Sequence, residues 1–195
     1  ASRRGVGGAP CQVGGAEGEA PTVYLGVCRA DARARVGGYG ETFDRAQDWE
    51  MNHRIRATGG KIWFNPKMQV SYRPRPTMRA LSRQYFQYGT WRREVMRRHP
   101  ETVQARYLAP PLAVAGIVTG AAAGLAAQTG VAPRWFGVGW LAPVGYIAAV
   151  SLGGLAISRN APLPVRARVP AVLAAMHMSW GTGFITSRSQ RRPQG

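Results

Sequence analysis

Acidic residues are scarce in this chain of 195 residues, and its second half has none. The nine Asp and Glu residues are outnumbered by 26 Lys and Arg residues, which gives a formal net charge of +17. All nine lie between Glu17 and Glu101, and the charges beyond them are arginines at the edges of apolar runs. This balance is typical of nucleic-acid binders, but also of membrane proteins, whose arginines gather on the cytoplasmic side of the spans. A coding bias toward Arg, 24 residues against 2 Lys, is a third explanation.

Cysteine and histidine are also rare. Cys11 and Cys28 are 17 residues apart, and no neighbouring His or Cys completes a set of metal ligands, which argues against a zinc site. We therefore expect a reduced pair that faces the cytosol. The chain opens with Ala1 in Gly- and Ala-rich sequence, without an apolar signal region. This opening suggests a fragment whose upstream half is missing.

Three long uncharged stretches fill the second half of the sequence. Their apolar parts are residues 108–128, 135–158 and 169–187. A helix that crosses a bilayer needs about 20 apolar residues, and the first two stretches meet this length. Their many Gly and Ala residues allow helices to approach closely. The third contains His177 and several hydroxyl side chains, so it either spans or lies at the interface. We predict a membrane domain of two or three helices over residues 107–195.

The arginines predict how these helices are oriented. Several precede the first stretch, Arg134 alone separates the first two, and three more follow the second. The positive-inside rule therefore places residues 1–106 and the second loop in the cytoplasm of a multi-pass plasma-membrane protein. If all three stretches crossed, the basic tail from Arg188 onward would lie outside. That conflict is a reason to doubt that the third stretch crosses.

Short elements separated by Gly and Pro are expected before the membrane domain. A Gly-rich loop should cover residues 1–20. The predicted strands are 22–28, 61–64 and 68–72, and the predicted helices are 29–36, 48–58 and 77–98. Glycine pairs at 37–38 and 59–60 should end the first two helices. The helix 77–98 carries an aromatic stripe (Tyr85, Tyr88, Trp91) beside many arginines, which suits the cytoplasmic surface of a membrane.

Two carboxylates stand at the start of the predicted helix 48–58. Asp48 and Glu50 point about 200° apart on a helix, so they cannot form a catalytic dyad. Glu50 has Arg54 four residues on, a favourable pair, and we expect Glu50→Gln to cost only a few tenths of a kcal/mol. Asp48 has Asn52 at that place and lacks an ionic partner. It is either a helix N-cap or a functional carboxylate.

Residues 22 to about 110 resemble the C-terminal half of the catalytic domain of family 2 glycosyltransferases. The nearest likeness is to the membrane enzymes of succinoglycan-type polysaccharide synthesis. It rests on two stretches in order, VYLGVCRADARARVGGYGETFDRAQDWEMNHRIRATGGKIWFNP and YRPRPTMRALSRQYFQYGTWRREVMRRHP, followed by apolar spans. The resemblance implies an α/β fold, a partial GT-A (Rossmann-like) domain over residues 1–106. It also implies inverting transfer of a sugar from a nucleotide-sugar donor to a lipid-linked or polysaccharide acceptor.

The same resemblance implies roles for individual residues. Gln47-Asp48 matches the motif that supplies the general base, so Asp48 would take the proton of the acceptor hydroxyl. The residues implied to bind the acceptor are Gly37, Gly38, Tyr39, Gln47, Gln87 and Trp91. Thr90 stands where the family's Gln-x-x-Arg-Trp motif has Arg, which favours transfer of a single sugar. Two simpler explanations stay open: the glycines can serve as a helix C-cap, and Trp91 as an interfacial anchor.

The resemblance also implies Mg²⁺ or Mn²⁺ in the full-length enzyme, held by an Asp-x-Asp motif. This chain contains no Asp-x-Asp and no Gly-rich phosphate loop after a strand, so we expect no metal on the chain alone. Two further hypotheses remain. One is a non-catalytic, basic, membrane-anchored adaptor in envelope polysaccharide assembly. The other is an Arg-rich nucleic-acid binder, which the apolar spans disfavour, so we expect no nucleic-acid partner.

Overall fold

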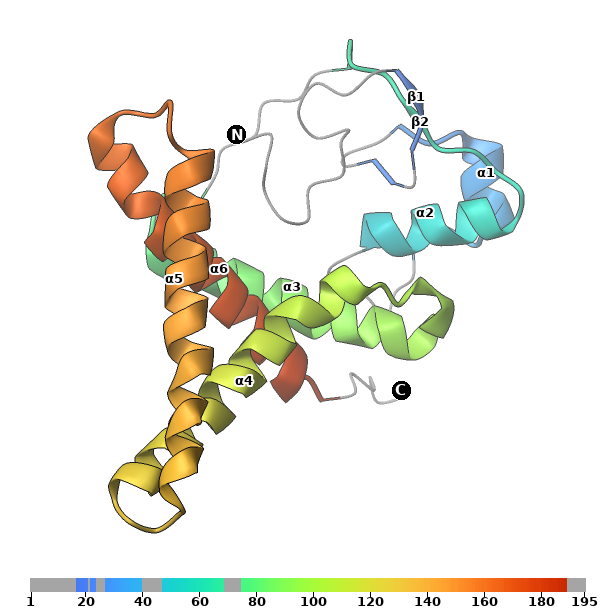
Figure 1. Cartoon of the computed structure of the whole chain (residues 1–195). Helices are drawn as coiled ribbons and strands as arrows, with labels where there is room; N and C mark the ends of the chain where they lie inside the picture. Colours follow the sequence, from blue (N-terminus) through green and yellow to red (C-terminus); the bar gives the residue numbers. More distant parts are fainter. Residues whose placement is uncertain (1–16, 21, 24–26, 40–46, 69–74, 189–195) are drawn as a thin grey trace. The chain divides into compact units, whose positions relative to one another are not determined.

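Figure 1 shows the computed structural model of the chain, which describes residues 17–20, 22–23, 27–39, 47–68 and 75–188. The described residues up to 68 belong to one compact unit, and residues 75–188 belong to a second. The second unit begins before the helix α3 (Met78–Arg98), because α3 packs along the last helix, α6 (Leu163–Thr186). The division into a transferase part up to residue 106 and a membrane part after it stays a prediction.

The first unit combines two helices with a minimal sheet. The strand β1 (Gly18–Glu19) pairs antiparallel with β2 (Trp63–Phe64), and the helices are α1 (Ala30–Arg35) and α2 (Gln47–Ala57). Within the described residues this two-stranded sheet is the whole of the β structure. The predicted α/β class is therefore met only in outline, and a partial GT-A, Rossmann-like sheet is not shown.

Two of the predicted strands fail where they can be examined. Thr22 and Val23 form no strand, because the side chain of Asn52 on α2 donates hydrogen bonds to the Thr22 hydroxyl (2.9 Å) and to the Val23 carbonyl (3.3 Å). Met68 is also outside any strand, and residues 24–26 and 69–72 lie outside the described residues. The Gly-rich loop predicted over residues 1–20 overlaps β1 at its end, and residues 1–16 lie outside the described part.

Both helices of the first unit end at glycine pairs, as predicted. Gly37 and Gly38 adopt positive φ angles of 73° and 74°, a conformation that glycine tolerates without strain. The N–H of Gly38 donates to the carbonyl of Arg33 (3.0 Å), and the N–H of Gly60 donates to that of Ile55 (2.9 Å). Each bond joins the second residue past the C-cap to the last turn of the helix, which is the Schellman arrangement. These caps set the residues at which α1 and α2 end and the chain changes direction.

The hydrophobic core of the first unit is small. Met51 and Ile55 on α2 and Ile62 near β2 are its buried residues. Val23, Cys28 and Val36 pack against them, half-buried. The other cysteine, Cys11, lies outside the described residues. α2 is therefore the element around which this unit is organised.

The second unit is helical. It contains α3, α4 (Ala105–Gln128), α5 (Leu141–Ile157) and α6, with short 3-10 helices η2 (Pro100–Thr102) and η3 (Arg134–Trp140). Thr77 caps α3, because its hydroxyl accepts a hydrogen bond from the N–H of Ala80 (3.2 Å). The predicted helix start at Thr77 is thereby confirmed.

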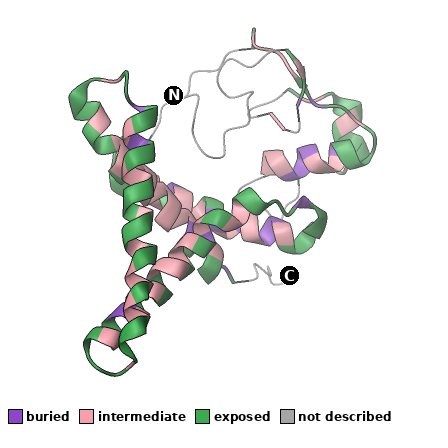
Figure 2. Cartoon of the chain, viewed as in Figure 1, coloured by how far each residue is buried: buried purple, intermediate pink, exposed green. Residues whose placement is uncertain are grey.

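Two segments of this unit are long and apolar enough to cross a membrane. They are Ala105–Gln128 and Arg134–Ile157, and no other described helix meets the same test. Their large side chains are exposed: Leu112 is 66% exposed, and Leu141 and Leu152 are each 69% exposed. In Figure 2, α4 and α5 are drawn mostly in the colours of exposed and intermediate residues. A protein surrounded by water rarely exposes so much continuous apolar surface. The pattern is what a lipid environment requires.

Glycines bring these helices close together. A Cβ atom at Gly89 of α3 would overlap the Trp180 carbonyl oxygen of α6, and one at Gly183 would overlap the Phe86 carbonyl. A Cβ at Gly124 of α4 would meet the indole ring of Trp140. Backbones can approach this closely only where side chains are absent.

α6 starts beside the end of α5 and finishes beside α3. Near its start, the ring of Pro170 would lie 3.0 Å from a Cβ at Gly154 of α5. Farther along, a Cβ at Gly181 would lie 2.5 Å from the carbonyl oxygen of Pro110, in the first turns of α4. Its last residues contact α3, the helix that leads into α4. The two ends of α6 are thus associated with the end of α5 and with the approach to α4.

Candidate functional site

Asp48 lies in the first turn of α2, one residue after the helix begins. It is half-buried, and no hydrogen bond or ion pair joins it to another residue of the described part of the chain. The N-cap explanation is not supported, because the helix already starts at Gln47. The positive end of the helix dipole favours a negative charge at this position. Asp48 is a carboxylate on a rigid helix that is not committed to a structural contact there.

The neighbours of Asp48 are set by its helical face. Residues four apart share a face, so Asp48 lies one turn before Asn52. Asn52 is 7% exposed and binds the segment that contains Thr22 and Val23. The side of α2 that carries Asp48 therefore faces this segment. The role of Asn52 was missed in the sequence, because no residue type marks its partners, a hydroxyl and a backbone carbonyl about thirty positions earlier.

Glu50 has a structural role on the opposite side of α2. Its carboxylate, 5% exposed, receives two hydrogen bonds from Arg54, at 2.6 Å (Nε–Oε1) and 2.7 Å (Nη2–Oε2). Arg54 also donates to the carbonyls of Val36 and Gly38, the latter at 2.7 Å. The pair therefore fastens the turn after α1 to α2. The structure favours a larger cost for Glu50→Gln than the few tenths of a kcal/mol expected for an exposed pair, because this pair is buried and holds two elements together.

The turn that Arg54 holds contains three of the predicted acceptor-binding residues. Gly37 and Gly38 form the helix cap described above, and the guanidinium of Arg33 lies 5.7 Å from the ring centroid of Tyr39. Tyr39 is 42% exposed. The C-cap explanation for the glycines is confirmed, and a contact of these residues with an acceptor stays a prediction.

The first turn of α2 divides the predicted site residues between two faces. Gln47 is three residues before Glu50, so it lies on the face that meets the glycine turn. Asp48, about 100° farther round, lies on the face of Asn52. Helix geometry thus sets Gln47 on the side of α2 that carries Glu50, and Asp48 on the neighbouring side. A substrate that touched both groups would lie across the start of the helix.

Gln87 and Trp91, the other predicted acceptor residues, are on α3 in the second unit. They are four residues apart on one face, with Gln87 half-buried and Trp91 only 8% exposed. An interfacial anchor must be exposed at the protein surface to contact lipid headgroups, whereas Trp91 is buried. The buried polar residue nearby is Gln84, whose amide donates to the Tyr88 hydroxyl (2.5 Å) and accepts from Arg75 (3.3 Å). The sequence gave no signal that singled out Gln84.

Thr90 and its neighbours bind α6. The Thr90 hydroxyl donates to the carbonyl of Gly183 (3.2 Å), and the Ser187 hydroxyl donates to the carbonyl of Thr90 (3.2 Å). Thr90 is the residue that stands in place of Arg in the family motif. Here its small side chain fits a close contact between two helices, which a long guanidinium side chain would hold apart.

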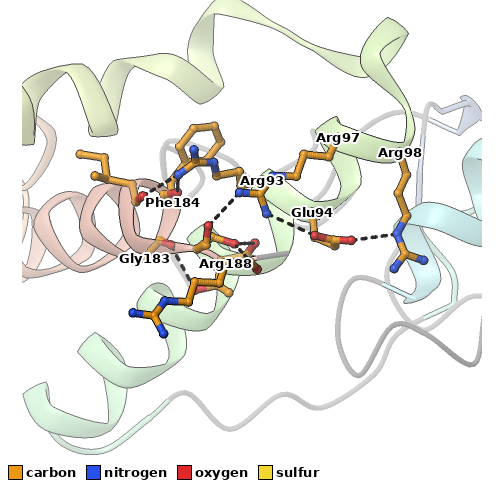
Figure 3. Close-up of polar contacts among 10 residues, drawn as sticks. Arg93, Glu94, Arg97, Arg98, Gly183, Phe184 and Arg188 are labelled. Atoms are coloured by element: carbon orange, nitrogen blue, oxygen red, sulfur yellow. Dashed lines mark hydrogen bonds and ion pairs between the residues drawn. The ribbon is translucent and has the colours of Figure 1, made fainter. Parts of the chain in front are cut away.

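Two arginines of α3 satisfy the last carbonyls of α6 (Figure 3). Arg93 donates to the carbonyls of Phe184 (2.8 Å) and Ile185 (2.5 Å), and Arg97 donates to that of Ser187 (2.8 Å). The final carbonyls of a helix have no partner within it, and its negative dipole end attracts cations. The sequence assigned these arginines to a face that meets anionic lipid. Instead, both hold the end of α6.

A third carboxylate, Glu94, is enclosed by arginines. Its side chain is 4% exposed and forms ion pairs with Arg97 (3.3 Å) and Arg98 (2.9 Å), as Figure 3 shows. Glu50 and Glu94 are therefore alike, since each is buried and neutralised by arginine from its own helix. Asp48 differs from both.

The chain is similar in sequence to a known protein of polysaccharide synthesis. It is 32% identical over 188 residues to succinoglycan biosynthesis protein ExoA of Rhizobium meliloti (strain 1021), a match that covers 94% of this chain. The chain spans about half of that protein, 52% of its length. No protein-family model and no solved structure matches the chain. The predicted resemblance to succinoglycan-type biosynthesis proteins is thus confirmed along nearly the whole chain.

Proposed function

We propose that the chain is part of a membrane glycosyltransferase of family 2. In this proposal it moves a hexosyl unit from a nucleotide-sugar donor to a lipid-linked or polysaccharide acceptor. The observation that carries the proposal is the similarity to a succinoglycan biosynthesis protein over 94% of the chain. Polysaccharides are built by forming glycosidic bonds, and the first unit offers a carboxylate of the kind that this chemistry uses.

Asp48 is the proposed general base. The acceptor hydroxyl oxygen attacks C1 of the donor sugar while its proton passes to a carboxylate oxygen of Asp48. The bond between C1 and the nucleoside diphosphate breaks, and its electron pair leaves with the diphosphate. Attack from the side opposite the leaving group inverts the configuration at C1. One carboxylate is enough for this step, and Asp48 has no described partner that competes for it.

No residue of this chain is assigned to a divalent metal. Mg²⁺ or Mn²⁺ offsets the charge of the leaving diphosphate in transferases of this kind. Glu50 and Glu94 do not fit such a role, because each is bound by arginine, and no Asp-x-Asp occurs in the sequence. The metal therefore enters no step assigned to these residues.

The proposed membrane arrangement has two spans, α4 and η3–α5. The arginines that flank them place α3 and the first unit on the cytoplasmic side. α6 begins after the second span, so it begins on that side, and it ends against α3 on the same side. We therefore propose that α6, which is one continuous helix, lies along the cytoplasmic face without crossing the membrane. An acceptor anchored in lipid would then reach a catalytic unit at the cytoplasmic surface.

Sugar transfer in membranes from cells that express the protein tests the proposed function. Labelled nucleotide sugars are supplied, and incorporation into lipid and glycan extracts is measured. Asp48→Asn removes the base and keeps the shape, so incorporation should fall by about 10²–10⁴-fold. The matched control is Asp31→Asn, the same chemical change on α1, where the carboxylate is exposed and pairs with Arg29.

The outcomes separate an enzyme from an adaptor. Loss in Asp48→Asn with normal transfer in Asp31→Asn supports Asp48 as the base. Normal transfer in Asp48→Asn contradicts that role. If wild-type membranes with any of the common nucleotide sugars transfer no more than membranes without the protein, the non-catalytic adaptor hypothesis gains the support instead.

A further inference from the structure

We propose that Arg92, Arg106 and Tyr107 form a binding site for the phosphate group of a membrane lipid at the start of α4. The site lies wholly within the second unit. It does not include Asp48 or any of the residues assigned to the acceptor. It rests on the proposed insertion of α4 into the membrane, but not on the proposed chemistry.

Two guanidinium groups from different helices meet on one aromatic ring. The guanidinium of Arg92 on α3 lies 4.4 Å from the ring centroid of Tyr107, and that of Arg106 on α4 lies 5.0 Å from it. Arg106 also donates a hydrogen bond to the Tyr107 hydroxyl (3.1 Å). Both distances are within the range at which an aromatic ring attracts a cation. Three side chains thus form one compact group with two positive charges.

The charge in this group is concentrated. Burial lowers the pKa of Arg92; the neighbouring Tyr107 opposes this effect, while the positive charge of Arg106 adds to it. The nearest carboxylate along α3, Glu94, is bound by Arg97 and Arg98. An anion placed against both guanidiniums would relieve their repulsion. Phosphate fits well, because a planar guanidinium can donate two parallel hydrogen bonds to its oxygens.

The position of these three side chains indicates that the phosphate they bind belongs to a lipid. Arg106 is in the first turn of α4, and no charged residue follows it until Arg134. In a spanning helix this turn lies at the level of lipid headgroups. The first turn also presents backbone N–H groups and the positive end of the helix dipole, both favourable to an anion. The hydrocarbon chains of a lipid would hold its phosphomonoester or diphosphate group at this depth in the membrane.

Arg106 and Arg92 differ in how strongly their substitution would affect folding. Arg106 is exposed, so Arg106→Gln removes a charge without disturbing packing. Arg92 is half-buried between α3 and Tyr107, so Arg92→Gln can also affect folding. Arg106→Gln therefore decides the proposal alone if the Arg92 variant does not fold. Arg159→Gln is the matched control, an exposed arginine just after α5 on the proposed cytoplasmic side.

The test is a calorimetric titration of the full chain in neutral detergent micelles. The probes are short-chain phosphatidic acid, short-chain phosphatidylcholine and inorganic pyrophosphate. We expect saturable binding of phosphatidic acid, about 10-fold weaker in Arg106→Gln and in Arg92→Gln, the loss of one charged hydrogen-bonding group. Arg159→Gln should change the affinity less than 2-fold by the same reasoning for an uninvolved charge. Asp48→Asn should bind as the wild type does, which separates this site from the catalytic proposal.

Three results would overturn the proposal. Equal weakening in Arg159→Gln and Arg106→Gln would show a diffuse charge effect. Unchanged affinity in Arg106→Gln would show that the group binds no phosphate. Pyrophosphate binding as tight as that of phosphatidic acid would assign the site to a soluble phosphate and contradict the lipid assignment.

Discussion

Large apolar side chains are buried in the first unit of the chain but exposed on the apolar helices α4 and α5 of the second. In the first unit the apolar residues Met51, Ile55 and Ile62 are turned inward and form a small core. In the second unit Trp91 and Val95 of α3 are buried, but on α4 and α5 the large side chains of Leu112 and Leu141 are exposed, and glycines lie where the helices come closest. The first pattern is stable in water, where burial of apolar area drives folding. The second suits lipid, where close backbone packing replaces that driving force.

The two units nevertheless share one kind of stabilising contact. In each, an arginine on a long helix donates to backbone carbonyls of an element distant in the sequence. Arg54 binds the turn at Val36 and Gly38, and Arg93 binds the end of α6 at Phe184 and Ile185. The comparison therefore predicts that arginine contacts matter in both units, whereas glycine contacts matter chiefly in the second.

The largest expected effect on stability is from Glu50→Gln in the first unit. The change leaves the charge of Arg54 without its carboxylate in a mostly buried position, so we expect a loss of about 3 kcal/mol. Hydrogen exchange measured along the chain should show faster exchange in α1 and α2 and no change in α3–α6. Asp31→Asn, which removes an exposed carboxylate that pairs with Arg29, should leave the exchange of α1 and α2 nearly unchanged. Equal effects of the two changes would mean that the Glu50–Arg54 pair does not hold the turn.

Gly89→Ala in the second unit should come next. The added methyl group would overlap the carbonyl oxygen of Trp180, so α3 and α6 must separate, at a cost of about 2 kcal/mol. Gly116→Ala is the matched control, since a Cβ there meets no atom within 4 Å and the change improves helix propensity. Exchange should rise in α3 and α6 only for Gly89→Ala. Unchanged exchange in this variant would contradict the close glycine contact.

Arg93→Gln should have the smallest of the three effects. It removes two charged hydrogen bonds to the end of α6, and water can replace part of them, so we expect a loss of about 1–2 kcal/mol. The loss should appear as faster exchange in the last turn of α6. Arg83→Gln, at an exposed position on the same helix, is the control and should leave that turn unchanged. If both variants behave alike, Arg93 is not a cap of α6.

The helix ends and the two long apolar helices were predictable because their signals are local. Thr77 caps α3 and the Gly37–Gly38 pair ends α1, and each effect involves residues within one turn. The first two apolar stretches were predicted from length and composition alone, and the structure places them in helices of the required length. The strand expected over 22–28 failed at its described residues because Asn52, about thirty positions away, binds Thr22.

The contacts that organise the candidate site are not local, which is why the sequence did not indicate them. Arg54 and Arg93 bind backbone carbonyls, and every residue has a carbonyl, so no residue type marks the partner. The pairing of Gly89 with α6 depends on a helix more than ninety positions away. Asp48 was identified through the family resemblance, and the structure adds that its helix face is distinct from that of Glu50.

The membrane placement of the second unit has the most direct test, the labelling of single cysteines in intact cells with an impermeant reagent. The positions are Arg83, Arg134, Arg159 and Arg188, each replaced by Cys in turn. Only Arg134→Cys should react from outside, and the other three should react only after the cytoplasmic side is opened. Arg188→Cys reacting from outside would show that α6 crosses. Arg134→Cys reacting only from the side of Arg83→Cys would contradict the crossing of α4 and, with it, a catalytic unit set against the cytoplasmic face.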